Sequence, residues 1–388
     1  MKILHLNSLD YGGAAVAVRR ISSSLEKKVN SEIFFFKDRN KILRNLFSKP
    51  YSIFDRILSN LKSKNKNSSF SSNSVPFSFI PLLIKIKNPD IVHLHWINAG
   101  MISVKDLLKI EKPIVWTMHD YWPFSGGYHY PEDNTLDNDP ENQKIYKTKE
   151  EVYDKIKNIK FVAVSKKLMD DANKGSLLKN KELSFINNPL NKDFFNVQNK
   201  SECKKRINID NKFTVLFCSN NSIFHKNKNF NFLVEVLNEF SETNHINLII
   251  CGEKQSVKKN LNLSSKINLI ETGFIESEKE LSIIYNAADI TAVPSFKESF
   301  GQIASESCAC GTPVIILKNT GLTDIINHKN NGYICAGENI KDFIDGIKWL
   351  QKQNSTLIAE KCQNSVVKFS YDNISDKYIK IYNEILNQ

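Results

Sequence analysis

The stretch TAVPSFKESFGQIASESCACGTPVIIL, residues 291–317, decides the fold of this 388-residue chain. Its first four residues are small or apolar and indicate a buried strand, a polar loop follows, and the apolar spacing over 300–309 predicts a helix. Gly311 and Pro313 then end that helix before a second apolar strand. The stretch therefore predicts a strand, loop, helix and strand in succession, which is the repeating unit of α/β proteins.

Two carboxylates bracket the start of this predicted helix. Glu298 lies in the loop, and Glu306 lies about two turns into the helix. The unpaired N–H groups of a helix start attract anions, so the amides around Ser299, Phe300 and Gly301 are candidate donors to a phosphate or a sugar oxygen. The alternative is that Glu298 is an ordinary acid at a helix start and Glu306 a solvated helix residue.

The segment ESFG, with Glu298 and Glu306 separated by seven residues and followed by GTPV, resembles the retaining glycosyltransferases of family 4. That family has the GT-B fold, and the resemblance extends over nearly the whole chain. It implies an α/β protein of two facing, Rossmann-like, doubly wound domains with a C-terminal helix that returns to the first domain. It also implies that Glu306 binds the ribose of a nucleotide and that Glu298 faces the hydroxyl groups of the donor sugar.

The pattern along the chain predicts how these domains are divided. Strands alternate with helices on both sides of INNPLN, which resembles the connection between the two domains and places a boundary near residue 190. We expect an N-terminal, acceptor-side domain over 1–190, a donor domain over 191–370 and a C-terminal helix over 371–388. In the second domain the predicted strands are 213–219, 246–251, 267–271 and 289–294, and the predicted helices between them are 231–240 and 278–288.

Composition limits the classes of partner. The 53 lysines and arginines exceed the 42 acidic residues and give a formal charge of +11, which indicates an anionic partner. The basic residues form no recognised nucleic-acid-binding module, so nucleic acid is not expected. The seven cysteines lack the spacing of a disulfide framework or a zinc site.

Two glycines follow the first predicted strand. Residues 2–7 indicate a strand, and a helix is expected from about Ala15, with Gly12 and Gly13 between them. The pattern G-x-G-x-x-G is absent, so a dinucleotide fingerprint is a poor match. The resemblance implies that the glycine pair, Gly13 included, lies near the donor phosphates and the acceptor.

Two lysines in the second domain are candidates to neutralise a diphosphate. Lys226 and Lys228 precede a predicted helix and would act there as compact point charges, while the alternative is that they are ordinary solvated lysines. The resemblance places Lys228 at the diphosphate, with Asn229 where glycine is usual. The arginine that often precedes it is missing, with Ser222 nearest, and Lys226 is its expected substitute.

A glycine and an aromatic residue after the strand at 267–271 complete the expected donor site. The resemblance implies that Gly273 and Phe274 lie against the nucleobase, largely through backbone contacts. The identity of the base is therefore not readable from these residues.

The segment HDYWPFSGGYHY, residues 119–130, follows another predicted strand at the edge where open α/β folds bind ligands. Aromatic faces stack on sugars, and Asp120 or His129 can bind hydroxyl groups. The segment resembles H-D-x-W-x-F-[ST]-G-G of family 4 enzymes that build surface polysaccharides, in which the histidine, here His119, contacts the transferred sugar. His93 and His95 share one face of a strand, and we expect buried, satisfied histidines there in preference to a zinc site.

A basic, amphipathic segment covers residues 37–66. Lysines and arginines alternate there with leucine, isoleucine and phenylalanine, which predicts a helix. One interpretation is that this helix lies on an anionic membrane surface. The other is that its apolar face packs on its own domain. Since no apolar run reaches about 18 residues and no signal-peptide core is present, the sequence predicts a cytoplasmic protein, with peripheral attachment to the inner face of the membrane as the alternative.

The resemblance implies a retaining glycosyltransferase that moves a sugar from a nucleotide-diphosphate sugar to a hydroxyl group of a saccharide or lipid-linked saccharide in surface polysaccharide synthesis. His119 and Glu298 are the expected catalytic residues. No cofactor or metal is expected, although residues 137–139 have the D-x-D form of a metal site. The alternatives are a nucleotide-sugar epimerase or phosphorylase of the same fold, and a non-catalytic, membrane-associated scaffold.

Overall fold

The chain is described here by a computed structural model. It describes residues 1–64, 69–131, 139–219, 223–253, 255–258 and 261–388. Two compact units divide the chain: unit 1 comprises residues 1–189 together with 371–388, and unit 2 comprises residues 190–370. Each unit is built around one parallel sheet.

Unit 1 contains a six-stranded sheet with the order β2-β1-β3-β4-β5-β6, in which every pair is parallel. The central strands are buried along their whole length, because helices cover both faces of a parallel sheet. The strands are β1 (Lys2–Leu9), β2 (Asn30–Lys37), β3 (Ile91–Leu94), β4 (Ile114–Met118), β5 (Ile159–Ala163) and β6 (Glu182–Phe185).

The helices of unit 1 begin where their sequence supplies a cap. The Asp139 side chain accepts hydrogen bonds from two amides at the start of one helix, and Ser165 caps another. The helices are α1 (Gly13–Leu25), α2 (Ile42–Lys62), α3 (Ile80–Lys87), α5 (Pro140–Lys155), α6 (Lys166–Lys174) and α13 (Tyr371–Leu386).

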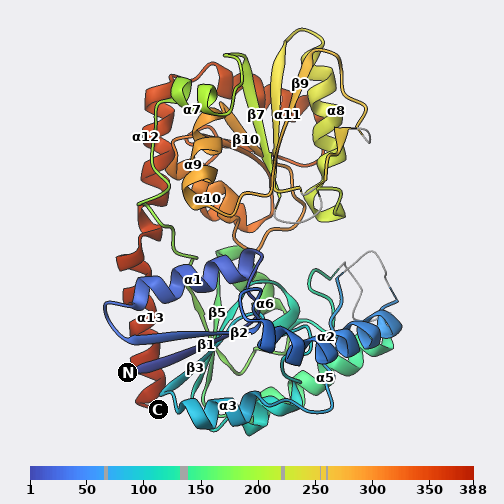
Figure 1. Cartoon of the computed structure of the whole chain (residues 1–388), viewed down its shortest axis with the longest axis vertical. Helices are drawn as coiled ribbons and strands as arrows, with labels where there is room; N and C mark the ends of the chain where they lie inside the picture. Colours follow the sequence, from blue (N-terminus) through green and yellow to red (C-terminus); the bar gives the residue numbers. More distant parts are fainter. Residues whose placement is uncertain (65–68, 132–138, 220–222, 254, 259–260) are drawn as a thin grey trace. The chain divides into compact units, whose positions relative to one another are not determined.

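The C-terminal helix α13 completes the core of unit 1 and lies beside α1 (Figure 1). Ile374 and Tyr382 of this helix belong to the same buried cluster as Ile3 and Ile91 of the sheet. The Tyr382 hydroxyl also lies 2.7 Å from Nδ1 of His93. The last segment of the chain is therefore part of the first unit.

Unit 2 repeats the parallel α/β arrangement with the strand order β12-β11-β10-β7-β8-β9. The strands are β7 (Phe213–Cys218), β8 (Ile246–Cys251), β9 (Ile267–Gly273), β10 (Ile290–Val293), β11 (Val314–Leu317) and β12 (Gly332–Cys335). The helices are α7 (Lys200–Arg206), α8 (Phe230–Ser241), α9 (Glu278–Ala287), α10 (Gln302–Ala309), α11 (Ile340–Gln351) and α12 (Ser355–Val366). The two parallel sheets confirm the predicted class of two Rossmann-like α/β domains.

The stretch 291–317 forms β10, α10 and β11, as its pattern predicts. The helix starts at Gln302, two residues later than expected, because Gly301 has a φ of 93° in the left-handed region. A Cβ at Gly301 would lie 2.1 Å from a methyl carbon of Leu322. Only glycine fits this position, which sets where the loop ends and the helix begins.

We expect that Ile374→Ala lowers the free energy of unfolding of unit 1 by about 2 to 5 kcal/mol, because it leaves a cavity in a fully buried cluster. Urea unfolding followed by tryptophan fluorescence reports mainly on this unit, because three of the four tryptophans, Trp96, Trp116 and Trp122, lie in it. Lys377→Ala, an exposed change in the same helix, serves as the control. Equal stability of the two variants would show that α13 does not hold the core.

Candidate functional site

Two residues that are 70 positions apart in the chain form an ion pair in unit 2. Nζ of Lys228 lies 2.5 Å from Oε1 of Glu298, and both side chains are largely buried. Lys228 ends a short 3-10 helix, η3 (Lys226–Lys228), that leads into α8, and Glu298 lies in the loop between β10 and α10. The structure thus brings together the cation expected at a diphosphate and the carboxylate expected at a sugar. Lys226 lies exposed on the same short helix.

Asn229 has the backbone conformation that glycine favours. Its φ of 55° and ψ of 37° lie in the left-handed region, which asparagine tolerates better than most residues. The position where the family usually has glycine therefore keeps the same turn into α8. Ser222, the residue nearest to the missing arginine, lies outside the described residues.

The start of α10 has a glycine at its cap position. Gly301 has no side chain that could accept from the first amides, and the first turn of the helix contains no acidic residue. Ser299 is buried next to it, and the Ser299 hydroxyl has no hydrogen-bond partner among the residues that the structure describes. The Gly321 amide donates to the Glu298 carbonyl at 2.8 Å, which holds the loop in place. The Ser299 hydroxyl is therefore a candidate donor to a phosphate or a sugar oxygen at this position.

Glu306 lies in the second turn of α10 and is only 5% exposed. The Tyr285 hydroxyl donates to its Oε2 at 2.8 Å. Burial and then the negative charge of Glu306 raise the pKa of Tyr285 well above its usual value, so this hydroxyl stays a hydrogen-bond donor. The interpretation of Glu306 as a solvated helix residue is therefore wrong. The carboxylate is held in a fixed position beside the sheet.

Gly273 and Phe274 lie at the carboxyl end of the same sheet. Gly273 ends β9 with a φ of 70°, and its carbonyl accepts from the Gly252 amide after β8 at 2.8 Å. A Cβ at Gly273 would meet none of the described residues within 4 Å. Phe274 follows and is partly buried. Open parallel sheets bind ligands at this edge.

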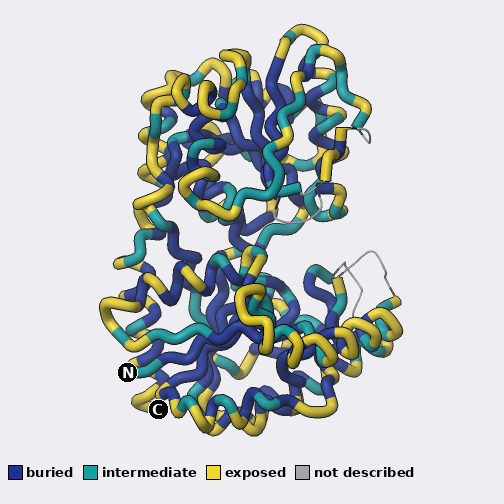
Figure 2. Tube along the Cα trace, viewed as in Figure 1, coloured by how far each residue is buried: buried dark blue, intermediate teal, exposed yellow. Residues whose placement is uncertain are grey.

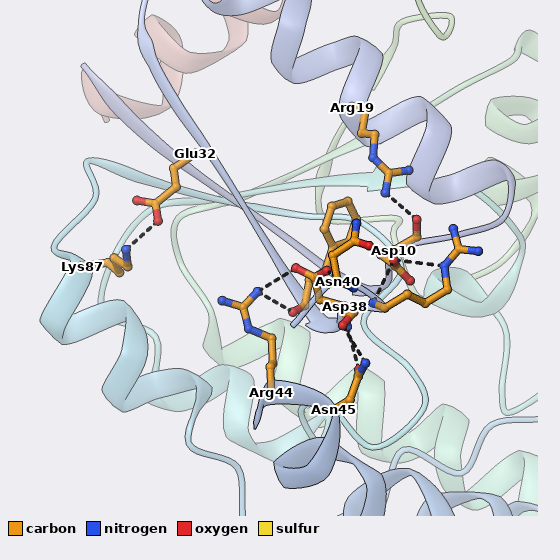
Figure 3. Close-up of polar contacts among 10 residues, drawn as sticks. Asp10, Arg19, Glu32, Asp38, Asn40, Arg44, Asn45 and Lys87 are labelled. Carbon is orange, nitrogen blue, oxygen red and sulfur yellow. Dashed lines mark hydrogen bonds and ion pairs between the residues drawn. The ribbon is translucent and has the colours of Figure 1, made fainter. Parts of the chain in front are cut away.

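In unit 1 the glycine pair forms the start of α1. Gly12, with a φ of 87°, is the cap residue and precedes the first helical residue Gly13. Next to it, Oδ2 of the buried Asp10 accepts from Arg39 through the amide at 3.0 Å and Nε at 3.2 Å, and Arg19 donates to the Asp10 carbonyl (Figure 3). Oδ1 of Asp10 has no partner within the described part of the chain. Sequence reasoning missed this carboxylate, although its position after a strand is the usual signal.

His119 follows β4 at the carboxyl edge of the first sheet. Its Nε2 lies 3.0 Å from Nδ1 of His95, and burial lowers the pKa of His119 to about 4. The ring is therefore neutral at pH 7. The side chain remains partly exposed, which is consistent with a residue that meets a ligand.

Asp120 and His129 do not face a ligand. They bind each other at 2.6 Å between Oδ2 and Nδ1, and Asp120 also accepts from the Trp96 ring at 3.0 Å. Nε2 of His129 lies 2.8 Å from the Ser71 hydroxyl. The expectation that either residue is available to sugar hydroxyls is thus wrong, since both are buried and hold the loop over 119–130 in place.

Lys149 fixes the same loop from below the surface. Its Nζ is buried and donates to the carbonyls of Trp122, Ser125 and Gly126, and it lies 3.4 Å from the centre of the Trp122 ring. Burial lowers the pKa of this lysine well below its usual value. Sequence reasoning missed Lys149, because nothing in the helical pattern around it distinguishes a buried lysine from a solvated one.

Helix α2 is amphipathic, but its polar face is buried and most of its apolar face is exposed, the reverse of an ordinary surface helix. Its buried positions are polar: the Ser52 hydroxyl donates to the Ala99 carbonyl at 2.8 Å, and the Ser59 hydroxyl accepts from the Ser72 amide at 2.9 Å. Figure 2 shows α2 as a largely exposed helix. Its exposed large apolar residues are Ile42, Leu43, Leu46, Phe47, Ile53, Phe54, Ile57 and Leu61. The Phe47 ring lies 5.3 Å from the Phe79 ring between centroids, but the other apolar side chains of this face are exposed. The interpretation that the apolar face packs on its own domain is therefore wrong for most of the helix.

Other sequence expectations concern metal ions and membrane spans. Asp139 is the cap of α5 and accepts from the Tyr128 hydroxyl, while residues 137 and 138 lie outside the described residues. Among the helices that the structure describes, none is long and apolar enough to cross a membrane.

The buried histidines make stability depend on pH. Burial lowers the pKa of His5 to about 3, and those of His93 and His95 lie well below 6.5, chiefly for the same reason. Below pH 6.5 the unfolded chain therefore binds protons that the folded chain does not. Stability is complete above that pH and falls as the pH is lowered towards 4.

We expect a loss of about 1.4 kcal/mol per pH unit for each such histidine over this window. Urea unfolding at several pH values between 4.5 and 7 measures the slope. His93→Gln should lower the slope by the contribution of one proton, whatever its effect on stability at pH 7. An unchanged slope in this variant would mean that His93 is protonated in the folded state.

Two family models match this chain, one over each half. Glycosyltransferase Family 4 matches residues 11–194, and Glycosyl transferases group 1 matches residues 199–366. Together the two matches span nearly all of both sheets.

Curated relatives match over a shorter stretch. The D-inositol 3-phosphate glycosyltransferase of Corynebacterium jeikeium is 36% identical over 109 residues, which is 28% of this chain and 26% of the relative. The enzyme of the same name from Mycobacterium leprae is 32% identical over 111 residues, with 28% and 26% covered. The matched part thus spans about a quarter of the length of these relatives.

Solved structures resemble the whole chain. Sucrose-phosphate synthase from Thermosynechococcus elongatus matches with a TM-score of 0.70 at 15% identity and covers 100% of both chains. The Anabaena protein HepE in complex with UDP-glucose matches with a TM-score of 0.67 at 16% identity and covers 99% of this chain and 100% of that one. At identities of 15% and 16%, these matches show only that this chain shares the fold of those proteins.

Proposed function

This chain belongs to the GT-B glycosyltransferases, with a family 4 domain followed by a group 1 domain, and we propose that it moves a sugar from a nucleotide-diphosphate sugar to a hydroxyl group of a saccharide or lipid-linked saccharide. We further propose retention of anomeric configuration and a role in surface polysaccharide synthesis. The observation that carries the proposal is the ion pair of Lys228 and Glu298 beside the start of α10 in unit 2.

The donor site of the proposal uses the groups that lie at the carboxyl edge of the second sheet. Lys228, assisted by Lys226, stabilises the negative charge of the departing diphosphate. Glu306 accepts hydrogen bonds from the ribose, in the position where Tyr285 holds it. The nucleobase lies against the backbone at Gly273 and Phe274. That HepE binds UDP and UDP-glucose makes uridine nucleotides the first donors to test.

The sugar itself meets both charged and neutral groups. Glu298 accepts from its hydroxyl groups, and its pairing with Lys228 orients the carboxylate. Ser299, Phe300 and Gly301 follow Glu298 directly in the sequence. The Ser299 hydroxyl and the amides of Phe300 and Gly301 are the proposed donors to the sugar oxygens. Positioning and charge stabilisation supply the catalysis, with the diphosphate assisting deprotonation of the acceptor. No metal or other cofactor has a role in this proposal.

The acceptor side of the proposal lies in unit 1. His119 contacts the transferred sugar, and the start of α1 with Gly13 faces the donor phosphates and acceptor. Saccharides and lipid-linked saccharides are the acceptors that the segment over 119–130 favours. Inositol 3-phosphate belongs in the same panel of acceptors, because curated relatives carry it in their names.

We also propose that α2 attaches the enzyme to an anionic membrane surface. Eight large apolar side chains are exposed along one helix while its serines face the domain, which leaves most of the apolar face without a covering element in the described residues. Lys41, Lys49 and Arg56 are exposed on the same helix or at its start. Apolar burial in the headgroup region and attraction of these cations to anionic lipids act together in such helices.

The donor site is tested by thermal unfolding with UDP, GDP, ADP and dTDP in EDTA. A nucleotide at 100 times its dissociation constant adds about 2.7 kcal/mol, or about 5 to 10 °C for a domain of the size of unit 2. We expect one nucleotide to stabilise the chain and Glu306→Ala to lose most of that shift. Glu235→Ala is the control, because it removes an exposed carboxylate from the same unit.

The outcomes separate the alternatives. A shift that Glu306→Ala removes and Glu235→Ala keeps supports the donor site and identifies the base. A folded chain that no nucleotide stabilises would favour the non-catalytic scaffold. Turnover of the matching nucleotide sugar without any acceptor would favour an epimerase or phosphorylase, and proton NMR of the product anomer decides whether configuration is retained.

The membrane proposal is tested by sedimentation with vesicles of 30% phosphatidylglycerol in phosphatidylcholine. We expect binding that weakens as salt is added and that Leu46→Ser with Ile57→Ser lowers at least tenfold, because each aliphatic side chain contributes about 1.5 to 3 kcal/mol on burial. Leu357→Ser with Val367→Ser removes two exposed apolar side chains from unit 2 and is the control. Equal loss in both pairs would contradict attachment through α2.

A further inference from the structure

A row of hydrogen-bonded imidazole rings leads from the interior of unit 1 to His119. Nδ1 of His5 lies 3.0 Å from Nε2 of His95, and Nδ1 of His95 lies 3.0 Å from Nε2 of His119. The three residues lie in β1 or directly after β3 and β4, which are neighbouring strands. We call His5, His95 and His119 the histidine row.

The row fixes the position of each proton relative to the next. A neutral imidazole has one N–H donor and one acceptor nitrogen, so a ring that donates at one nitrogen accepts at the other. Burial keeps all three rings neutral at pH 7 by lowering their pKa values. The direction of the bond between His5 and His95 therefore determines the direction of the bond between His95 and His119.

The inner end of the row, at His5, determines in which direction the hydrogen bonds of the row run. Nε2 of His5 is fully buried and has no partner among the described residues. If the protons pointed inwards, this nitrogen would carry a buried N–H with no acceptor, and unmatched buried N–H groups are rarer than unmatched acceptors. If they point outwards, each ring is protonated at Nδ1 and His5 keeps an unused lone pair. Each ring then donates towards the surface.

We propose that His5 and His95 are positioning residues that hold His119 in the Nδ1–H tautomer, so that His119 presents a hydrogen-bond donor to its ligand. The tautomer follows from the geometry of unit 1 alone. Its use rests on the proposed function: a neutral donor at this position binds an oxygen of the transferred sugar and does not act as a general base through Nδ1.

The same rings also form the group of His5, His93 and His95, whose nitrogens lie within 4.8 Å of one another. A metal ion would need several free nitrogens there. Both nitrogens of His93 are engaged, by the Tyr382 hydroxyl at 2.7 Å and the Thr117 hydroxyl at 2.8 Å, and both nitrogens of His95 are engaged within the row. Among the described nitrogens of this group, only Nε2 of His5 is left to bind a metal ion. The contacts therefore favour the hydrogen-bonded row over a metal site.

The tautomer is measured on the full chain labelled with ring ¹⁵N-histidine, without any ligand. The ¹⁵N shifts of a ring distinguish the protonated nitrogen from the acceptor, and the spectrum of His119→Gln assigns the signals of His119. We expect Nδ1 of His119 to carry the proton at pH 7. A proton on Nε2 of His119 in the wild-type chain overturns the proposal.

Variants at His5 test the transmission along the row, because His5 does not hydrogen-bond to His119. His5→Leu removes the donor to His95, and we expect His119 to lose its single tautomer. His5→Asn keeps an N–H near the position of Nδ1 and should restore it. His93→Leu is the matched control: His93 is a buried ring that packs against His5 and stacks on His95, with its hydrogen bonds outside the row.

Turnover measures the consequence separately. With UDP-glucose as the probe, or the sugar of whichever nucleotide stabilises the chain, we expect His5→Leu to lower kcat about three- to tenfold with little change in KM, as for the loss of one hydrogen bond made in the reacting complex. His5→Asn should recover most of that loss. An unchanged His119 tautomer in His5→Leu overturns the positioning role, whereas absence of turnover in the wild-type chain with the expected tautomer counts against the proposed function alone.

Discussion

Parallel pairing of the strands is the constraint on which the candidate residues of each unit depend. In a parallel sheet the carboxyl ends of all strands lie at one edge, so residues from distant parts of the chain gather there without any local signal. In unit 2 this edge collects the loop after β10 and the turn before α8, where Glu298 and Lys228 pair. In unit 1 it collects the start of α1 and His119 after β4. The direction of the strands therefore determines which candidate site residues lie together in each unit.

Much of the fold can be predicted from the sequence, because parallel strands are buried on both faces and give continuous apolar runs. The runs over 213–219, 246–251 and 289–294 each form a strand, and the glycine and proline after residue 309 end α10 as expected. Shorter or mixed runs carry less signal, and GYIC, which forms β12, was not predicted. Of the site, the position of Glu298 near Lys228 could be expected from the family pattern, while the contact itself required the fold.

Residues whose role depends on burial could not be identified. The pattern of α2 defines an apolar and a polar face, but periodicity does not say which face meets the domain, and here the serines do. In the sequence Lys149 cannot be told from the other lysines of a charged helix. Only the fold shows that its Nζ donates to three carbonyls. Asp10 and the histidine row likewise depend on contacts between strands that are far apart in sequence. Sequence propensity predicts the secondary structure of a segment, whereas these contacts depend on which other segments pack against it.

The place of α13 has a consequence for synthesis on the ribosome. The sheet of unit 1 is complete once residue 185 has been made, but the helix that covers Ile91 and His93 begins at residue 371. At about 5 to 20 residues per second, the intervening unit 2 takes on the order of 10 to 40 seconds to synthesise. During that time the apolar surface that α13 later covers is open to solvent and to chaperones. The first unit to be translated is therefore the last to finish folding.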